Sequence, residues 1–245
     1  MKMNGKTKRY ECLIFDADHT LLDYIADEMA AFTALYQELG MKITPPLLAL
    51  SRKMSEENWT AAGLYDVHDK TVQKNYHKLY RSHVQGIFEN IFSVFPCSAD
   101  PFSTGKRFLE LLENDGHLFE GVKETLGALS NKTGGRYEIC IATNGLNSIQ
   151  KGRLKALEPF ASAFFVSEHV GYIKPLPQFF ERILKERNRT SDECLMIGDS
   201  LSSDVAGARA VGMDSCWLNP ERRENTTEHT PDYEIAALPE LLNFL

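Results

Sequence analysis

The chain has 245 residues, of which 43% are hydrophobic and 25% are charged, and its formal net charge is −7. This balance is typical of a globular enzyme and excludes a disordered or fibrous chain. The acidic charge disfavours binding of a nucleic-acid polymer, because affinity for a phosphate backbone comes from clustered lysines and arginines. No apolar run approaches the roughly 20 residues that cross a bilayer, and none follows the basic N-terminus, so we expect neither a membrane span nor an export signal.

The five cysteines are odd in number, scattered along the chain and never arranged as C-x-x-C. A disulfide framework or a zinc site is therefore not expected. Three of them lie in apolar runs, where a free thiol behaves as a small hydrophobe. This usage indicates a reducing compartment, so we expect a cytoplasmic protein.

The first expected element is a strand over "YECLIFD" (10–16). This apolar run ends abruptly in "DADHT" (16–20), where two aspartates are separated by one small residue. Taken alone, the pair could equally be a turn that caps the following helix.

Residues 25 to about 115 show a helical rather than a strand-like pattern of apolar residues. Apolar side chains recur there at spacings of four and three, which predicts helices; an example is the series Ile25, Met29, Phe32, Tyr36 and Leu39. The segments "TPP" (44–46) and "FPCSADP" (95–101) break this region into pieces. We therefore expect an all-helical insertion inside an α/β domain.

After residue 120, strand-like and helical patterns alternate. Strands are expected at 137–145, 163–171, 194–200 and 214–220, and helices at 122–129, 146–157, 177–187 and 203–210. Such alternation is typical of right-handed βαβ units and a parallel sheet, which the first strand is expected to join. The polar stretch 219–231 is expected to be a surface loop.

The predicted architecture is therefore α/β, with a Rossmann-like parallel sheet core and an inserted all-helical cap domain. The core is expected to comprise residues 1–22 and 116–245, and the cap residues 23–115.

Polar residues follow several of the expected strands. They are Asp16 and Asp18 after the first strand, Thr143 and Asn144 after the next, Asp199 and Asp204 after the run that begins at Cys194, and Lys174 just before a helix. Because the ends of parallel strands form the ligand crevice of an open sheet, we expect these side chains to converge. Carboxylates so crowded stay ionised only with a cation among them, and Mg²⁺ prefers oxygen ligands of this kind.

This ordered set resembles the motifs of the haloacid dehalogenase superfamily, over the whole chain. "DADHT" (16–20) is similar to the first motif of that family, D-x-D-x-T, Thr143 to the second, Lys174 to the third and "GDSLSSD" (198–204) to the fourth. The helical insertion is similar to the type-1 cap of the family. The wording of the motifs most resembles the branch of pyrimidine 5′-nucleotidases.

The resemblance implies a phosphomonoesterase. Asp16 would be the nucleophile that forms an aspartyl-phosphate, and Asp18 would be the general acid and then the general base. Mg²⁺ would be bound by the Asp16 carboxylate, the Asp18 main-chain carbonyl and Asp199. Thr143, the Asn144 backbone N–H and Lys174 would hold the phosphate oxygens. Asp204 and Thr20 would support these groups from behind.

Specificity is expected to depend on residues around the pocket. His19 stands where many relatives carry glycine. A histidine can occupy the turn if the backbone conformation is undemanding, and its ring would then edge the pocket; we expect a loop residue rather than a catalyst. The expected cap contains an aromatic and polar group, Trp59, Tyr65, His68 and Tyr76, of which Trp59 and Tyr65 are further candidates for specificity. Side chains at these spacings also commonly serve helix packing.

The expected substrate is a small phosphate ester, in particular a nucleoside 5′-monophosphate, and the expected assembly is a monomer or homodimer. A phosphatase of sugar phosphates and a phosphomutase similar to β-phosphoglucomutase remain open alternatives. A dehalogenase would need neither Asp18 nor a metal cluster, because halide leaves without a proton. The alternative outside enzymes is a phospho-accepting signalling or binding module, but such receiver domains are shorter and lack a large helical insertion.

Overall fold

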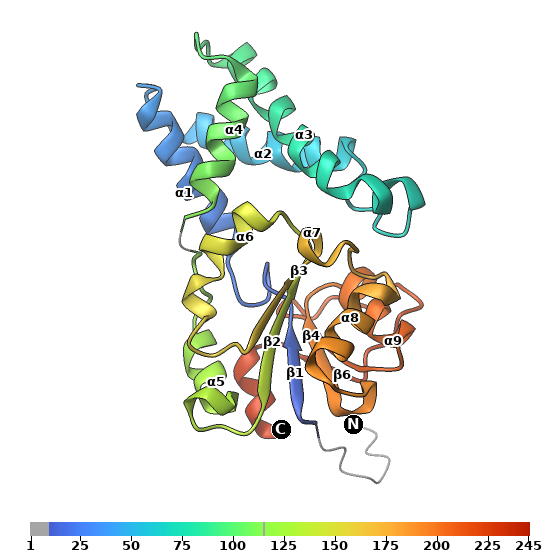
Figure 1. Cartoon of the computed structure of the whole chain (residues 1–245). Coiled ribbons are helices and arrows are strands. Elements are labelled where there is room, and N and C mark those ends of the chain that lie inside the picture. Colours follow the sequence, from blue (N-terminus) through green and yellow to red (C-terminus); the bar gives the residue numbers. More distant parts are fainter. Residues whose placement is uncertain (1–9, 115) are drawn as a thin grey trace.

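The computed structural model describes residues 10–114 and 116–245. Among these, six strands form one parallel sheet in the order β3-β2-β1-β4-β5-β6. The strands are β1 (Cys12–Phe15), β2 (Glu138–Thr143), β3 (Ala163–Val166), β4 (Cys194–Gly198), β5 (Asp214–Leu218) and β6 (Tyr233–Ile235). The predicted fold class is confirmed: a parallel sheet flanked by helices, with a group of helices beyond it (Figure 1).

Both faces of the sheet are buried, and successive strand residues face opposite sides. Leu13 and Phe15 belong to an apolar cluster that includes α5 (Val122–Leu129) and the C-terminal turn Leu238–Asn243. Cys12 and Ile14 belong to a second cluster, with residues of α8 (Pro177–Arg187) and α9 (Ala206–Ala210). A sheet covered on both sides needs strands that are apolar throughout, which explains the run "CLIF".

The first strand lies at the point where the strand order reverses. β1 pairs with β2 on one side and with β4 on the other, and the later strands continue outward from β4. In open α/β sheets the ligand crevice lies outside the carboxyl ends of the strands at this position. The segment after Phe15 is therefore at the expected ligand site.

Four helices of the described chain separate β1 from α5 in sequence: α1 (Tyr24–Glu38), α2 (Pro45–Ala61), α3 (Lys70–Val94) and α4 (Pro101–Leu112). Each begins at a side chain that accepts a hydrogen bond from the first turn, namely Asp23, Thr44, Asp69 and Asp100. They share an apolar cluster that includes Phe32, Tyr36, Phe88 and Phe108. The breaks expected at "TPP" and "FPCSADP" are thus the starts of α2 and α4.

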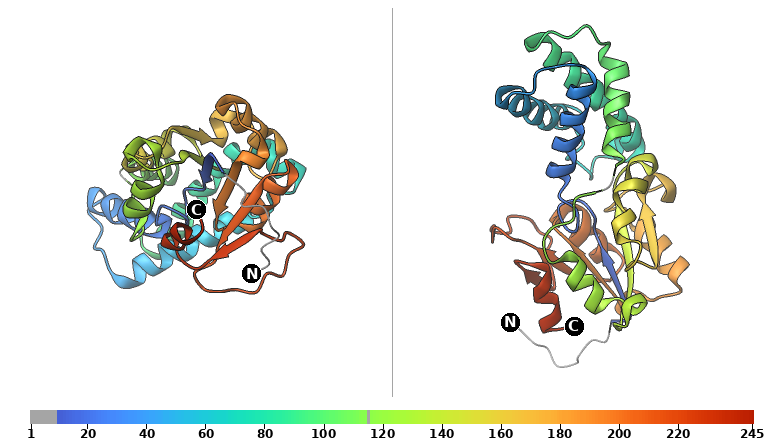
Figure 2. Two further views of the ribbon diagram at one scale, coloured as in Figure 1. Left: turned by 90° about the horizontal axis from the view of Figure 1, so that it is seen from below. Right: turned by 90° about the vertical axis from the view of Figure 1, so that its left-hand side faces the viewer.

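These helices lie beyond the carboxyl ends of the strands (Figures 1 and 2). The chain passes from the core to α1 and later returns through two segments that run side by side. Leu22 and Leu118 form an antiparallel bridge, and the Asp23 N–H donates to the His117 carbonyl at 2.8 Å. The expected cap, residues 23–115, remains a prediction as to its boundaries, and residue 115 itself lies outside the described residues.

Several expected elements differ from those observed. The strand expected at 163–171 ends at Val166, where α7 (Ser167–Val170) begins, because its second half folds into a turn of helix that Gly171 ends with φ 86°. The helix expected at 146–157 is divided into α6 (Asn147–Arg153) and a separate turn at Lys155–Leu157. The helix expected at 203–210 starts with a wider turn at Leu201–Val205 and continues as α9.

Two further expectations need correction. The strand β6 was not expected, because its three residues are too few to show a period; it forms by pairing with β5. Ile25 is 42% exposed, so the apolar stripe of α1 does not include it.

The expected absence of an export signal concerns residues 1–9, which lie outside the described part of the chain. Within that part, none of the helices combines the length and the hydropathy that a membrane crossing requires.

Candidate active site

Asp16 and Asp18 lie in a tight turn at the end of β1. The Asp16 N–H donates to the Ile197 carbonyl at 2.8 Å, so the pairing with β4 continues up to Asp16. His19, within this turn, has φ 62°. The condition of an undemanding backbone is therefore not met, because this is the left-handed region that glycine enters freely and other residues enter at a cost.

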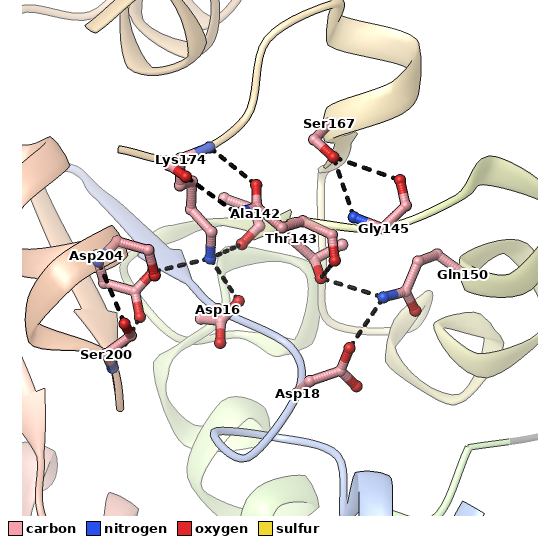
Figure 3. A network of polar contacts seen from close by, with 12 residues as sticks. Asp16, Asp18, Ala142, Thr143, Gly145, Gln150, Ser167, Lys174, Ser200 and Asp204 are labelled. Carbon is pink, nitrogen blue, oxygen red and sulfur yellow. Dashed lines mark hydrogen bonds and ion pairs between the residues drawn. The ribbon is translucent and has the colours of Figure 1, made fainter. Parts of the chain in front are cut away.

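Lys174 is the centre of the polar contacts at this edge of the sheet (Figure 3). Its Nζ donates to Asp16 Oδ1 at 2.5 Å, to Asp204 Oδ1 at 2.8 Å and to the Ala142 carbonyl at 2.8 Å. These acceptors match the three donors of an ammonium group. Burial lowers the pKa of Lys174, but the Asp16 and Asp204 carboxylates raise it by more, so the lysine stays charged although it is buried.

Asn144 fixes the segment that carries this lysine. Its Oδ1 accepts from the Lys174 N–H at 2.8 Å, and its Nδ2 donates to the Lys174 carbonyl at 3.0 Å. The side chain is therefore occupied by the backbone of Lys174. Any contact of Asn144 with a phosphate would come from its main-chain N–H, as the sequence suggested.

An acidic cluster lies beside Lys174. Carboxylate oxygens of Asp16, Asp199 and Asp204 are within 4.8 Å of one another. Burial raises the pKa of Asp16 well above its usual range; Lys174 opposes this shift, and Asp204 and Asp199 add to it. Burial, followed by the Asp204 carboxylate, raises the pKa of Asp199 to about 7.

Three carboxylates beside the single ammonium group of Lys174 leave negative charge in excess here. A divalent cation at this point would lower the pKa values of both Asp16 and Asp199, because a bound cation favours ionised carboxylates. Asp204 is already engaged at both oxygens, by Lys174 and by the Ser200 N–H at 3.1 Å, whereas Asp16 and Asp199 can turn to a cation. The donor set thus fits a hard ion such as Mg²⁺, with Asp204 in a supporting position.

Asp18 points away from the acidic cluster, towards α6. Its Oδ2 accepts from Gln150 Nε2 at 3.0 Å, and its Oδ1 is 2.5 Å from Arg153 Nη2. Burial raises the pKa of Asp18, but the Arg153 guanidinium and Gln150 lower it by more. Gln150 also donates to Thr143 Oγ1 at 3.2 Å, so it connects two predicted site residues (Figure 3).

Neither Gln150 nor Arg153 was predicted from the sequence. The signal that could have found them is their spacing, because residues three apart share a face of a helix, and this helix directly follows the predicted site residues Thr143 and Asn144.

Thr20 is fully buried, and its hydroxyl has no hydrogen-bond partner among residues 10–114 and 116–245. No contact therefore links it to the acidic cluster, and its supporting role stays a prediction.

A cavity of about 340 Å³ lies between these residues and the helices α2 and α3. Asp16, Asp18, Thr143, Asn144, Lys174 and Asp199 line its core side. The opposite side carries the aromatic rings of Trp59, Tyr65, Tyr76 and Tyr80 beside the polar side chains of Arg52, Ser55 and Glu56. The structure thus brings the predicted catalytic, phosphate-binding and metal-binding residues to one shared space.

The three candidate specificity residues also line this cavity. The His19 ring lies 5.9 Å from the ring of Tyr24, and burial lowers the pKa of His19. Trp59 meets Tyr65 edge to face at 6.4 Å and Tyr80 at 5.4 Å, so it serves packing as well as the cavity wall. His68 is not among the described lining residues; it stacks on His229 at 5.8 Å.

Comparison with known proteins agrees with this geometry. The family model of haloacid dehalogenase-like hydrolases matches residues 10–212. The HAD-hydrolase YfnB of Bacillus subtilis is 30% identical over 242 residues, 97% of this chain and 96% of that protein. The pyrimidine 5′-nucleotidase PynA of Streptococcus pneumoniae is 32% identical over 239 residues, 96% of this chain and 95% of that protein.

A crystal structure of Bacillus subtilis YfnB bound to magnesium is also similar. It has a TM-score of 0.79 and 29% identity, covering 97% of this chain and 99% of that chain, and its description reports interdomain movement.

Proposed function

Because the chain belongs to the haloacid dehalogenase-like hydrolases, we propose that it is a Mg²⁺-dependent phosphomonoesterase that works through an aspartyl-phosphate on Asp16. The observation that carries this proposal is the contact between Asp16 and the buried Lys174 on the floor of the cavity, next to Asp199 and Asp204. A carboxylate that is exposed to a cavity and flanked by a fixed cation is arranged to attack an anionic ester.

The reaction has two displacements. A carboxylate oxygen of Asp16 attacks phosphorus, and the bond from phosphorus to the leaving oxygen breaks with its electron pair on that oxygen, which takes a proton from Asp18. Water then attacks the phosphorus of the aspartyl-phosphate while Asp18 removes a proton from that water, and the bond from phosphorus to Asp16 breaks with its electron pair on the carboxylate. Phosphate and free Asp16 are the result.

Mg²⁺ would be held by the Asp16 carboxylate, the Asp18 main-chain carbonyl and Asp199. When bound, it would offset negative charge and so allow a carboxylate to approach a phosphate ester. Lys174, whose three donors go to Asp16, Asp204 and the Ala142 carbonyl, would offset the charge of the phosphate by its own positive charge. Thr143 and the Asn144 N–H would donate to the phosphate oxygens. A donor of this type contributes roughly 3 to 4 kcal/mol to transition-state stabilisation in other enzymes.

We further propose that the substrate is a nucleoside 5′-monophosphate, in particular one with a pyrimidine base. The aromatic wall at Trp59 and Tyr65 offers rings on which a base could stack, opposite the proposed phosphate site. The similarity to the nucleotidase PynA supports the same substrate class.

The free cysteines of the described chain suit a reducing cytoplasm. A monomer or homodimer remains our expectation.

The test is a phosphate-release screen over nucleoside monophosphates, sugar phosphates and phosphorylated cofactors, with Mg²⁺ and with a chelator. We expect turnover that needs Mg²⁺, that is highest with pyrimidine nucleotides, and that Asp16→Asn lowers by about four orders of magnitude or more. Sugar phosphates as the best substrates would replace the nucleotidase by a sugar phosphatase. Interconversion of hexose phosphates without release would indicate a phosphomutase. Undiminished turnover by Asp16→Asn would refute the nucleophile.

A further inference from the structure

Arg153 is a buried arginine at the end of α6 that contacts aspartates from two different parts of the molecule. Its side chain has no exposed surface. Its Nη2 lies 2.5 Å from Asp18 Oδ1 and 2.7 Å from Asp27 Oδ2, and its Nε donates to the same Asp27 oxygen at 2.8 Å. The guanidinium also lies over the Tyr24 ring, 5.1 Å from its centre. A buried charge is tolerated only with compensation of this kind, so both aspartates matter to its placement.

Each oxygen of the Asp18 carboxylate has a neighbour on α6. Arg153 Nη2 lies 2.5 Å from Oδ1 as an ion pair, although Oδ1 accepts no hydrogen bond within the described residues, and Gln150 Nε2 donates to Oδ2 at 3.0 Å. Arg153 Nη1 donates to Gln150 Oε1 at 3.1 Å and so closes a ring of three side chains. The carboxylate cannot rotate without breaking one of these contacts. Figure 3 shows it directed at Gln150 rather than at Asp16.

Asp27 extends this network into the cap. It lies in the first turn of α1, and it is buried. Its Oδ1 accepts from the His117 N–H at 2.6 Å and from His117 Nδ1 at 2.7 Å, on the segment that returns to the core. Asp27 thus joins α1, α6 and the returning segment. A change in the orientation of α1 relative to α6 would change the contact between Asp27 and Arg153.

We propose that Arg153 is a positioning residue, which orients the Asp18 carboxylate for proton transfer and, through Asp27, makes this orientation depend on the position of α1. The inference rests on the proposed function, since it concerns the proton that Asp18 delivers. Asp18 lines the cavity, whereas Arg153 and Gln150 are not among the described lining residues. Arg153 therefore acts on the reaction through Asp18 and does not touch the substrate.

Two substrates with different leaving groups test this proposal. The alkoxide of a nucleoside 5′-monophosphate is a poor leaving group and needs a proton to leave quickly. 2,4-Dinitrophenolate is a good leaving group and leaves quickly without a proton. In single-turnover experiments with Mg²⁺, each protein is measured at its own pH optimum, because removal of Arg153 also changes the pKa of Asp18. Arg153→Met is then expected to slow cleavage of the nucleotide by about 100-fold or more, the scale of general acid catalysis. The rate of dinitrophenolate release in the same experiments should change by less than about threefold, because the bond from phosphorus to this leaving group breaks without proton transfer. Asp18→Asn provides the reference pattern.

Further variants separate the outcomes. Arg153→Lys keeps the charge without the planar fork and is expected to lie between Arg153→Met and the native protein. If neither variant folds, Gln150→Met, which leaves no charge unpaired, takes the same comparison. Equal losses on the two substrates, or no loss on either, would overturn the proposal. Arg187→Met is the matched control, since it removes an arginine that pairs with Glu138 in the core, and it should leave both rates unchanged.

The dependence on α1 has its own variant. Asp27→Asn removes the charge that α1 offers to Arg153 and should slow nucleotide cleavage by about tenfold with the rate of dinitrophenolate release unchanged. No effect on either substrate would refute the link to α1. Failure of the proposed function looks different: Asp16→Asn would then still cleave both substrates, whatever the Arg153 variants show.

Discussion

The core wall and the cap wall of the cavity are built in different ways. On the core wall, polar groups near the strand ends are fixed by directional contacts, as Lys174 is by three acceptors. On the cap wall, where Arg52 and Ser55 also contact Glu28, aromatic rings of α2 and α3 pack against one another, as Trp59 and Tyr80 do at 5.4 Å. We therefore expect the chemistry to depend on hydrogen bonds at one sheet edge and the choice of substrate to depend mainly on how the helices pack. Changes to the core wall should therefore affect every substrate, and changes to the cap wall only some.

The largest effect is expected from Lys174→Met, which tests the core wall. It leaves the buried carboxylates of Asp16 and Asp204 without their cation, so turnover of every substrate should fall by about 1000-fold and unfolding free energy by about 3 to 5 kcal/mol. Urea unfolding with and without Mg²⁺ measures the second effect, and added Mg²⁺ should restore part of the stability. Lys53→Met, which breaks an exposed pair with Glu57, is the control and should change stability by less than about 1 kcal/mol. Equal effects of the two variants would contradict the comparison.

The next effect concerns the stability of the cap wall in acid. Burial lowers the pKa of His83 from 6.5 to about 4, and its ring packs against Trp59. Because the unfolded chain binds the proton more readily, this stabilisation is complete above pH 6.5 and is lost as the pH falls to about 4. The loss amounts to about 3 kcal/mol at 1.36 kcal/mol for each pKa unit.

His83→Gln, which keeps a donor for the Tyr80 carbonyl, should therefore lose about 3 kcal/mol less than the native protein between pH 7 and pH 4. Urea unfolding followed by the fluorescence of Trp59, in a Trp217→Phe background, measures the cap directly. If the two proteins lose stability in parallel, His83 is not the residue that titrates.

A smaller effect is expected from Tyr65→Ala, which tests selectivity. Tyr65 is 60% exposed and lines the cavity, so its removal should leave stability almost unchanged. Loss of a stacking surface should lower kcat/KM for a pyrimidine nucleotide by about tenfold, with a short alkyl phosphate unaffected. Tyr172→Ala, at a tyrosine that is 46% exposed and is not among the described lining residues, serves as the control. A tenfold loss of kcat/KM on both substrates would mean that Tyr65 does not determine the choice of substrate.

The smallest effect concerns the turn that joins the two walls. With φ 62°, His19 occupies backbone space that costs about 1 to 2 kcal/mol for a residue with a Cβ. His19→Gly should therefore be more stable than His19→Ala by about 1 kcal/mol, which thermal unfolding can resolve. The reverse order would mean that the turn relaxes out of the left-handed region.

The difference between the core wall and the cap wall also explains which site residues could be predicted from the sequence. Asp16 and Thr143 were found because an apolar run that ends in a polar residue is local information, and parallel strands end at one edge. Lys174 was found as the single cation before a helix, in "YIKP" (172–175). Arg153 was missed because its partners, Asp18 and Asp27, lie far away in sequence and only tertiary packing reveals the contact. For His19, the departure from glycine was visible, but the backbone demand at that position was not.

The cap could be predicted as helical but not as a binding surface. The spacing that places Trp59 and Tyr76 on helices is the same whether their rings face a core or a cavity, and in the structure they face both. The short strand β6 was missed for a related reason, because three residues show no period and the strand is defined by its pairing with β5.

The bridge between Leu22 and Leu118 has a consequence for how this architecture can diversify. A polypeptide that leaves and re-enters at adjacent points imposes no length on the excursion between them, so this excursion can be shortened, extended or exchanged as a cassette without altering the register of the six strands. Recombination at this junction would combine a new helical segment with an unchanged sheet and its strand-end residues. Chimaeras joined at these two leucines would show whether the substrate selectivity changes with the helical segment.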